Sequence, residues 1–96
     1  MNPFLKDILK LLLHEVAPLS LRSICQKLHE HEFYITSGLC NLEELRLICK
    51  DDNERYVLSN KGRQYISLSE IEQRSYEKKH PFLLYCDAYD LDAEQE

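Results

Sequence analysis

The chain has 96 residues, of which 44% are hydrophobic, and only two are glycines, so it can bury the core of one compact domain. Its formal net charge is −5, and the acidic excess lies in residues 70–96, because residues 1–69 hold nine acidic and nine basic side chains. The apolar runs fall short of the roughly 20 residues that span a bilayer, and the first residues lack the features of a secretion signal. These properties exclude a membrane protein, indicate a cytoplasmic one, and show no obvious basic patch for nucleic acid.

The first predicted helix begins with Asn2 as its N-cap and Pro3 at its first position, where a missing N–H costs nothing. Pro18 is expected to end it. Phe4 and Leu11 lie beside the main apolar stripe, where they either widen the core-facing surface or contact another element or another chain. The main stripe follows helical spacing and consists of Leu5, Ile8, Leu9, Leu12, Leu13 and Val16.

Two further helices are predicted before residue 46. Ser20 is a suitable N-cap for the second, whose apolar face is formed by residues 21, 24, 25 and 28. Thr36 is the predicted N-cap of the third, along which Leu39 and Leu42 recur at helical spacing. Residues 29–35 would then form a connection longer than the three or four residues of a compact helix-turn-helix, so either the second helix runs on to His31 or the turn is expanded.

A two-stranded ribbon is predicted after the third helix. Residues 47–48 lead into a strand, residues 51–53 have turn chemistry, and residues 55–58 form the returning strand. The alternation places Tyr56 and Leu58 on the inward face, over the third helix.

A last helix is expected to follow the ribbon. Ser59 caps it, and it carries Tyr65, Ile66, Leu68 and Ile71. We expect this helix to continue as far as Lys79, because Pro81 is the first residue that must stop it.

The segment from 47 to 66 carries a recognisable pattern: Leu-Ile, a turn, then Arg-Tyr-x-Leu-Ser-x-x-Gly-Arg-x-Tyr-Ile. It resembles the wing signature of small bacterial and phage transcriptional regulators. The resemblance implies a mainly α (α+β) fold, a winged helix-turn-helix with a two- or three-stranded antiparallel wing and a C-terminal helix. It implies a winged-helix domain over residues 1–70 and a C-terminal helix, apolar segment and acidic tail over 71–96. It also implies a short strand near residues 17–21 that pairs with the wing, and close packing around Gly62.

The leading functional expectation is a small DNA-binding transcriptional regulator, working as a dimer on double-stranded DNA. Its third helix would enter the major groove, with Thr36, Ser37 and Asn41 nearest the base edges. Phosphates would be held by dispersed cations around the wing. These candidates are Arg46, Lys50, Arg55, Lys61 and Arg63.

An alternative of a different class is a winged-helix module for protein–protein interaction, an adapter or an inhibitor of another regulator, that does not bind DNA. Glu43 and Glu44 on the third helix favour it, because they would repel phosphates. An apolar run at 82–86 also favours it, since such a run needs a covering surface. The predicted partner or dimer contacts are Phe4, Leu11, Phe82, Leu84 and Tyr85.

No chemistry beyond binding is expected. Cys25, His29 and His31 match no standard zinc spacing, and the chain has no nucleophile elbow and no phosphate-binding glycine loop. The sequence therefore predicts no enzyme, no metal and no cofactor. The cysteines at 25, 40 and 49 are expected to behave as small apolar residues.

Overall fold

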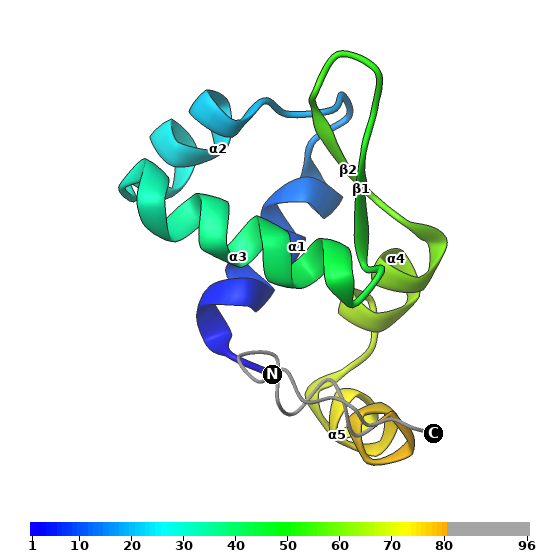
Figure 1. The fold of residues 1–96 in the computed structure, drawn as a ribbon. Coiled ribbons are helices and arrows are strands. Elements are labelled where there is room, and N and C mark those ends of the chain that lie inside the picture. The colour runs from blue at the N-terminus through cyan, green and yellow to red at the C-terminus, as the bar shows by residue number, and fades with distance from the viewer. Residues whose placement is uncertain (81–96) are drawn as a thin grey trace.

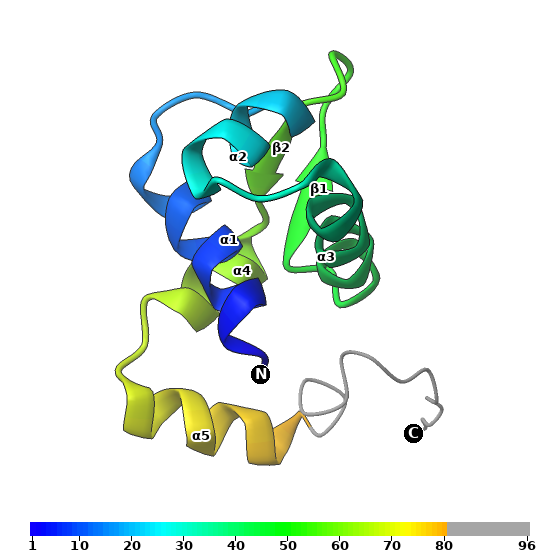
Figure 2. The same ribbon diagram turned by 90° about the vertical axis from the view of Figure 1, so that its left-hand side faces the viewer.

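The structure is a computed structural model that describes residues 1–80, so Phe82, Leu84 and Tyr85 lie outside the described residues. The described part is mainly helical with a small antiparallel sheet, as predicted. The tip of the β-hairpin and the last helix lie at opposite ends of the molecule (Figures 1 and 2). The elements are α1 (Pro3–His14), α2 (Leu21–Leu28), α3 (Glu32–Glu44), β1 (Ile48–Lys50), β2 (Tyr56–Leu58), α4 (Asn60–Ile66) and α5 (Glu70–Lys79).

Helix α1 begins as predicted. The side chain of Asn2 accepts a hydrogen bond from the N–H of Phe4 at 2.7 Å, which satisfies one of the free donors at the helix start. The helix ends at His14, and Val16 is fully exposed. The prediction that Val16 belongs to the apolar stripe is therefore wrong, because Pro18 ends helical geometry several residues before itself.

Helix α3 begins earlier than predicted. Its N-cap is His31, whose Nδ1 accepts a hydrogen bond from the N–H of Phe33 at 3.0 Å. Thr36 therefore lies inside the helix, and its prediction as the N-cap is wrong. The physical reason is burial: Ile35 stands one helical turn before Leu39, and both side chains are buried, so helical geometry from residue 32 onwards places both in the core.

The connection between α2 and α3 is correspondingly short. It consists of residues 29–31, so the predicted long connection is also wrong. His29 adopts a left-handed conformation with φ 56°, and this residue reverses the chain just after α2. A turn of this length falls within the range of a compact helix-turn-helix.

The sheet pairs β1 with β2 in antiparallel register, with Ile48 opposite Leu58. An isolated bridge joins Leu19 to Tyr56 through two backbone hydrogen bonds of 3.1 and 2.7 Å, as expected for a segment near residues 17–21. Leu58 is buried and Tyr56 half-buried, so both point inward. Strand β2 packs on α1, whereas β1 packs on α3, which corrects the expectation that β2 lies over the third helix.

The last two helices were predicted as one. The structure breaks them after Ile66, and α5 starts anew with Ser69 as its N-cap. The hydroxyl of Ser69 accepts from the N–H of Glu72, and the Glu72 carboxylate accepts from the N–H of Ser69. This capping box offers better terminal hydrogen bonds than a continuous helix at these serines. Ile71, in the first turn of α5, is 79% exposed.

Helix α5 is attached to the body of the protein through a buried polar cluster. The Tyr65 hydroxyl donates a hydrogen bond to the Glu77 carboxylate, and the ammonium group of Met1 lies 3.3 Å from the same carboxylate. Burial raises the pKa of Glu77, but the bonds from Tyr65 and from the ammonium group outweigh it, so the net pKa is lowered. A charged Glu77 therefore holds the start of α1, α4 and α5 together.

The core is built around α1, which packs against α2, α3, α4 and β2. Helix α3 crosses α1 closely at Gly38, where an added Cβ would lie 3.0 Å from the Ile8 side chain. Gly62 marks a second close approach, because an added Cβ would lie 1.9 Å from the backbone oxygen of Leu47. The close packing expected around Gly62 is thus confirmed.

Candidate functional site

The exposed face of α3 is the candidate site. From Phe33 to Leu42 the helix carries no charged residue, and Ile35, Leu39 and Leu42 point into the core. The outward face therefore consists of uncharged side chains from the remaining positions. Two are large aromatics at the start of the helix: Phe33 is 71% and Tyr34 59% exposed.

The two aromatic rings contact each other. Their centroids are 5.7 Å apart and the planes meet at 77°, an edge-to-face arrangement that is favourable for aromatic pairs. The first turn of α3 therefore presents two exposed aromatic rings that contact each other. This pair was missed in the sequence, where residues 33–35 were interpreted as a connection. The helical spacing of Ile35, Leu39 and Leu42 is the signal that could have revealed it.

The predicted base-reading residues lie on the same helix. Thr36 and Ser37 are exposed and Asn41 is half-buried, so the structure brings all three to the outer part of α3. The acidic residues lie at both ends of this face, with Glu32 in the first turn and Glu44 in the last.

The segment that includes α3 and the hairpin is acidic as a whole. Residues 32–59 hold six carboxylates and three basic side chains. The hairpin turn itself carries three of the carboxylates, so the tip of the hairpin is acidic. The six are Glu32, Glu43, Glu44, Asp51, Asp52 and Glu54, and the basic residues are Arg46, Lys50 and Arg55.

Two of the predicted phosphate ligands act at the end of α3. Arg46 has φ 64°, and its N–H donates to the Glu43 oxygen at 2.9 Å, while the next N–H reaches back to Leu42. This is a Schellman termination with arginine where glycine is usual. The Lys61 ammonium lies 3.3 Å from the Leu45 oxygen, and burial, then Arg46, lowers the pKa of Lys61.

The other predicted phosphate ligands are dispersed. The Lys50 ammonium lies 5.5 Å from the centre of the Tyr56 ring, and Tyr56, with smaller contributions from Glu43 and Glu54, raises the pKa of Lys50. Arg55 is exposed beside the hairpin turn, and Arg63 is exposed on α4. The five cations therefore belong to the end of α3, the ribbon and α4, and do not form one row along α3.

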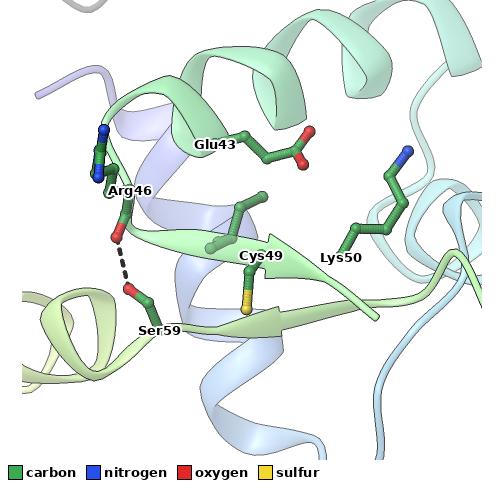
Figure 3. Close-up of a pocket in the computed structure, with 6 residues that line it drawn as sticks. Glu43, Arg46, Cys49, Lys50 and Ser59 are labelled. Carbon is green, nitrogen blue, oxygen red and sulfur yellow. Dashed lines mark hydrogen bonds between the residues drawn. The ribbon is translucent and has the colours of Figure 1, made fainter. Parts of the chain in front are cut away.

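A shallow hollow lies between the last turn of α3 and the ribbon (Figure 3). Its volume is about 450 Å³. The hydroxyl of Ser59 donates to the Arg46 oxygen at 2.6 Å on its wall. Figure 3 shows Cys49 pointing to the opposite side of β1 from Lys50. The lining residues are Glu43, Arg46, Ile48, Cys49, Lys50 and Ser59.

The predicted contact residues of α1 and the cysteines lie away from the outward face of α3, except Cys40. Phe4 and Leu11 are half-buried and pack against the core, which corresponds to the wider core-facing stripe of α1. Cys25 is half-buried, whereas Cys40 and Cys49 are exposed, so the expectation of small apolar behaviour fails for the latter two. Among residues 1–80, no three metal-ligating side chains gather, and no helix there is long and apolar enough to cross a membrane.

Comparison with known proteins supplies one structural likeness. No protein-family model matches the chain, and a search of curated proteins finds no match. A solved structure described as "A Pericyclic Reaction enzyme" superposes with a TM-score of 0.57 at 19% sequence identity. The match covers 82% of this chain and 21% of that chain, so this chain spans about a fifth of the length of that protein.

This likeness corrects one expectation. We expected that the chain is not an enzyme, and that is contradicted, because the same fold occurs in a protein named as an enzyme. At 19% identity the likeness shows a shared fold, and the sites on fold surfaces are set by individual residues.

Proposed function

We propose that this chain is a winged-helix module that binds another protein through the exposed face of α3. The observation that carries the proposal is the Phe33–Tyr34 pair, which stands in solvent on the helix that a winged helix presents to its target. Aromatic side chains of this kind supply most of the binding energy in many protein interfaces.

The element order supports the winged-helix part of the proposal. Three helices are followed by a two-stranded antiparallel hairpin, and the Leu19–Tyr56 bridge extends that hairpin to a third segment. The three-residue turn between α2 and α3 fits a helix-turn-helix. Gly62 lies against Leu47, where the resemblance to winged helices implies close packing.

Charge favours a protein target over DNA. A helix in the major groove passes between two rows of phosphates, and α3 carries Glu32, Glu43 and Glu44 with no basic residue. The wing tip would bring further carboxylates to the backbone. Lys61, one of the cations predicted to offset them, is instead within 3.3 Å of a backbone oxygen at the end of α3.

The charges on α3 also indicate which kind of partner surface would be complementary to it. An uncharged face with carboxylates at both ends fits an apolar surface that has lysine or arginine at its rim. A second copy of α3 fits less well, because either orientation of two such helices brings like charges together at the ends. The structural neighbour carries this fold in about a fifth of its chain, so the proposal includes docking beside a catalytic unit in a longer protein or in a partner.

Two measurements test the proposal. The first titrates the purified chain with random duplex DNA across a salt series. We expect no binding even at low salt, whereas affinity that falls steeply with salt would instead support the transcriptional-regulator prediction.

The second measurement captures partners with the wild type and with matched single variants. Phe33→Ser removes one exposed aromatic from α3, and Ile71→Ser removes an exposed apolar side chain from α5. We expect Phe33→Ser to weaken binding of the captured partner at least tenfold, which corresponds to about 1.4 kcal/mol, and Ile71→Ser to leave it unchanged. Equal effects of the two variants would contradict docking on α3.

A further inference from the structure

The start of α3 is capped by an imidazole. Nδ1 of His31 accepts a hydrogen bond from the N–H of Phe33 at 3.0 Å, and the backbone oxygen of the same histidine accepts from Tyr34 and Ile35. A serine or asparagine side chain at this position would accept such a bond at any pH near neutrality. Histidine accepts it only while Nδ1 carries no proton, so the bond requires the neutral imidazole with its hydrogen on Nε2.

The donor in this bond belongs to the outward face of α3. Phe33 is largely exposed and its ring contacts Tyr34, so the residue that presents one aromatic ring is also the residue whose N–H the imidazole holds. Ile35, which is buried, anchors the helix immediately after the pair. Loss of the cap would therefore loosen residues 32–34 and leave the rest of α3 packed on the core.

A proton can reach this cap directly, because the His31 side chain is exposed. Imidazoles ordinarily gain a proton as the pH falls from about 8 to about 5. The incoming proton bonds to Nδ1 through the lone pair that accepts from Phe33, and both ring nitrogens are then donors. The N–H of Phe33 loses its acceptor, and a positive charge is added at the start of the helix, where the macrodipole disfavours it.

We propose that His31 is a proton-sensitive cap that orders the first turn of α3 at neutral pH and loosens it on mild acidification. The consequence for binding rests on the proposed function. Loosening would release Phe33 and Tyr34 from their positions on the outward face, and the added charge would repel a partner with lysine or arginine at its rim. Binding through α3 is therefore strongest while His31 is neutral.

The turn that contains His31 holds other ionisable side chains. Glu30 and Glu32 flank His31, and His29 is a second imidazole in the same turn. Carboxylates ordinarily change charge below about pH 5, so a titration above that pH acts on the imidazoles. A test of the proposal must therefore separate His31 from His29.

The elements that pack on α3 bring their charged groups to other places. On α2, burial and then Glu32 raise the pKa of the Cys25 thiol, which stays neutral at these pH values, and Lys27 lies 3.8 Å from Glu15. Where α1 crosses α3, its contacts are apolar side chains. Lys50 of β1 lies beside the last turn of α3 (Figure 3), at the opposite end from His31.

The first experiment follows the full chain by NMR between about pH 8 and about pH 5.5. We expect the His31 ring to carry its hydrogen on Nε2 at the upper pH, and the Phe33 amide signal to shift with the same midpoint as that ring. Helical Cα shifts should decrease at residues 32–34 and stay constant at Leu39 and Leu42. A hydrogen on Nδ1 at the upper pH, or a Phe33 signal that does not follow the His31 ring, would overturn the proposal.

Two matched variants separate the imidazoles of the turn. His31→Asn keeps a preferred N-cap that takes up no proton in this range, so the first turn should remain helical at both pH values. His29→Asn removes the other imidazole and tolerates the left-handed backbone at φ 56°, so the pH response should remain. A response that persists in His31→Asn or disappears in His29→Asn would overturn the assignment. If either variant does not fold, the wild-type titration still decides the question.

The second experiment measures binding at about pH 7.5 and about pH 5.5, using the captured partner whose binding Phe33→Ser weakens. We expect the wild type to bind at least threefold more weakly at the lower pH, and His31→Asn to remove the difference. Equal changes in the wild type and in His31→Asn would overturn the regulation of binding. If no partner depends on Phe33, the proposed function fails, and the NMR titration still decides whether His31 controls the first turn.

Discussion

Gly62→Ala should strongly destabilise the protein. An added methyl carbon at this position would lie 1.9 Å from the Leu47 oxygen and 2.8 Å from its carbonyl carbon. Carbon–oxygen contacts normally begin at about 3.3 Å, so α4 would have to move away by roughly 1.4 Å. Both obstructing atoms belong to the backbone, and a change of rotamer cannot relieve the overlap.

The movement would disturb three hydrogen bonds that join α4 to the end of α3. Ser59 donates through its N–H to Leu47 and through its hydroxyl to Arg46, and Lys61 donates to Leu45. Each such bond contributes about 0.5–1.5 kcal/mol, whereas alanine gains about 1 kcal/mol over glycine inside a helix. We expect a net loss of about 2 kcal/mol or more, since the buried Tyr65 on α4 must also shift.

Urea unfolding followed by circular dichroism measures this loss, and a thermal scan should show a decrease of at least about 8 °C. Gly38→Ala is the matched control. Its added Cβ would lie 3.0–3.2 Å from the side-chain ends of Phe4, Leu5 and Ile8, which can move, so we expect a change within about 1 kcal/mol. Wild-type stability in Gly62→Ala would refute the close approach of α4 to Leu47.

Three further predictions concern single residues. Because the pKa of folded Glu77 is lowered, ionised Glu77 adds to the free energy of unfolding above its unfolded pKa of about 4.3, and this stabilisation is lost as the pH falls through the folded pKa. Glu77→Gln should flatten this part of the curve of unfolding free energy against pH. An unchanged curve would contradict the assignment. Tyr65→Phe should cost about 1–3 kcal/mol in urea unfolding, since it removes the hydroxyl that donates to a buried carboxylate; a neutral effect would show that the bond is not formed. Arg46→Gly should stabilise the chain by about 0.5 kcal/mol because it relieves the left-handed backbone, and a loss of stability would mean that the arginine side chain holds the end of α3.

The parts of the fold that the sequence predicted well are those with strong local signals. Asn2 precedes a proline and a regular apolar stripe, and the turn after Lys50 is rich in acidic residues and asparagine. In the structure the Asp51 carboxylate accepts from the N–H groups of Asn53 and Arg55 at 2.8 and 3.0 Å, which is the turn chemistry expected of aspartate. Short-range hydrogen bonds of this kind depend on a few adjacent residues.

The errors arose where tertiary burial or a less common cap decides the boundary. His31 is not among the preferred N-caps, so Thr36 was the more obvious choice, although burial of Ile35 requires an earlier start. The break before α5 did have a local signal, since Ser69 and Glu72 have the spacing of a capping box. The exposure of Phe33 could be predicted only once the start of α3 was correct.

Helix α3 has an inward face that packs on the core and an outward face that is exposed to solvent. Different residues form the two faces, so the residues that fix the fold are not those available for binding. Ile35 and Leu39 fix the helix against the core, and any sequence that keeps such inward positions can retain the same arrangement. Phe33, Tyr34 and the terminal carboxylates contribute little to that packing, because they are exposed or lie at the helix ends. A shared fold with a protein named as an enzyme therefore constrains the inward residues alone. Under the proposed function, the partner is selected on the outward face of α3, where aromatic rings and acidic ends favour a protein surface over a phosphate backbone.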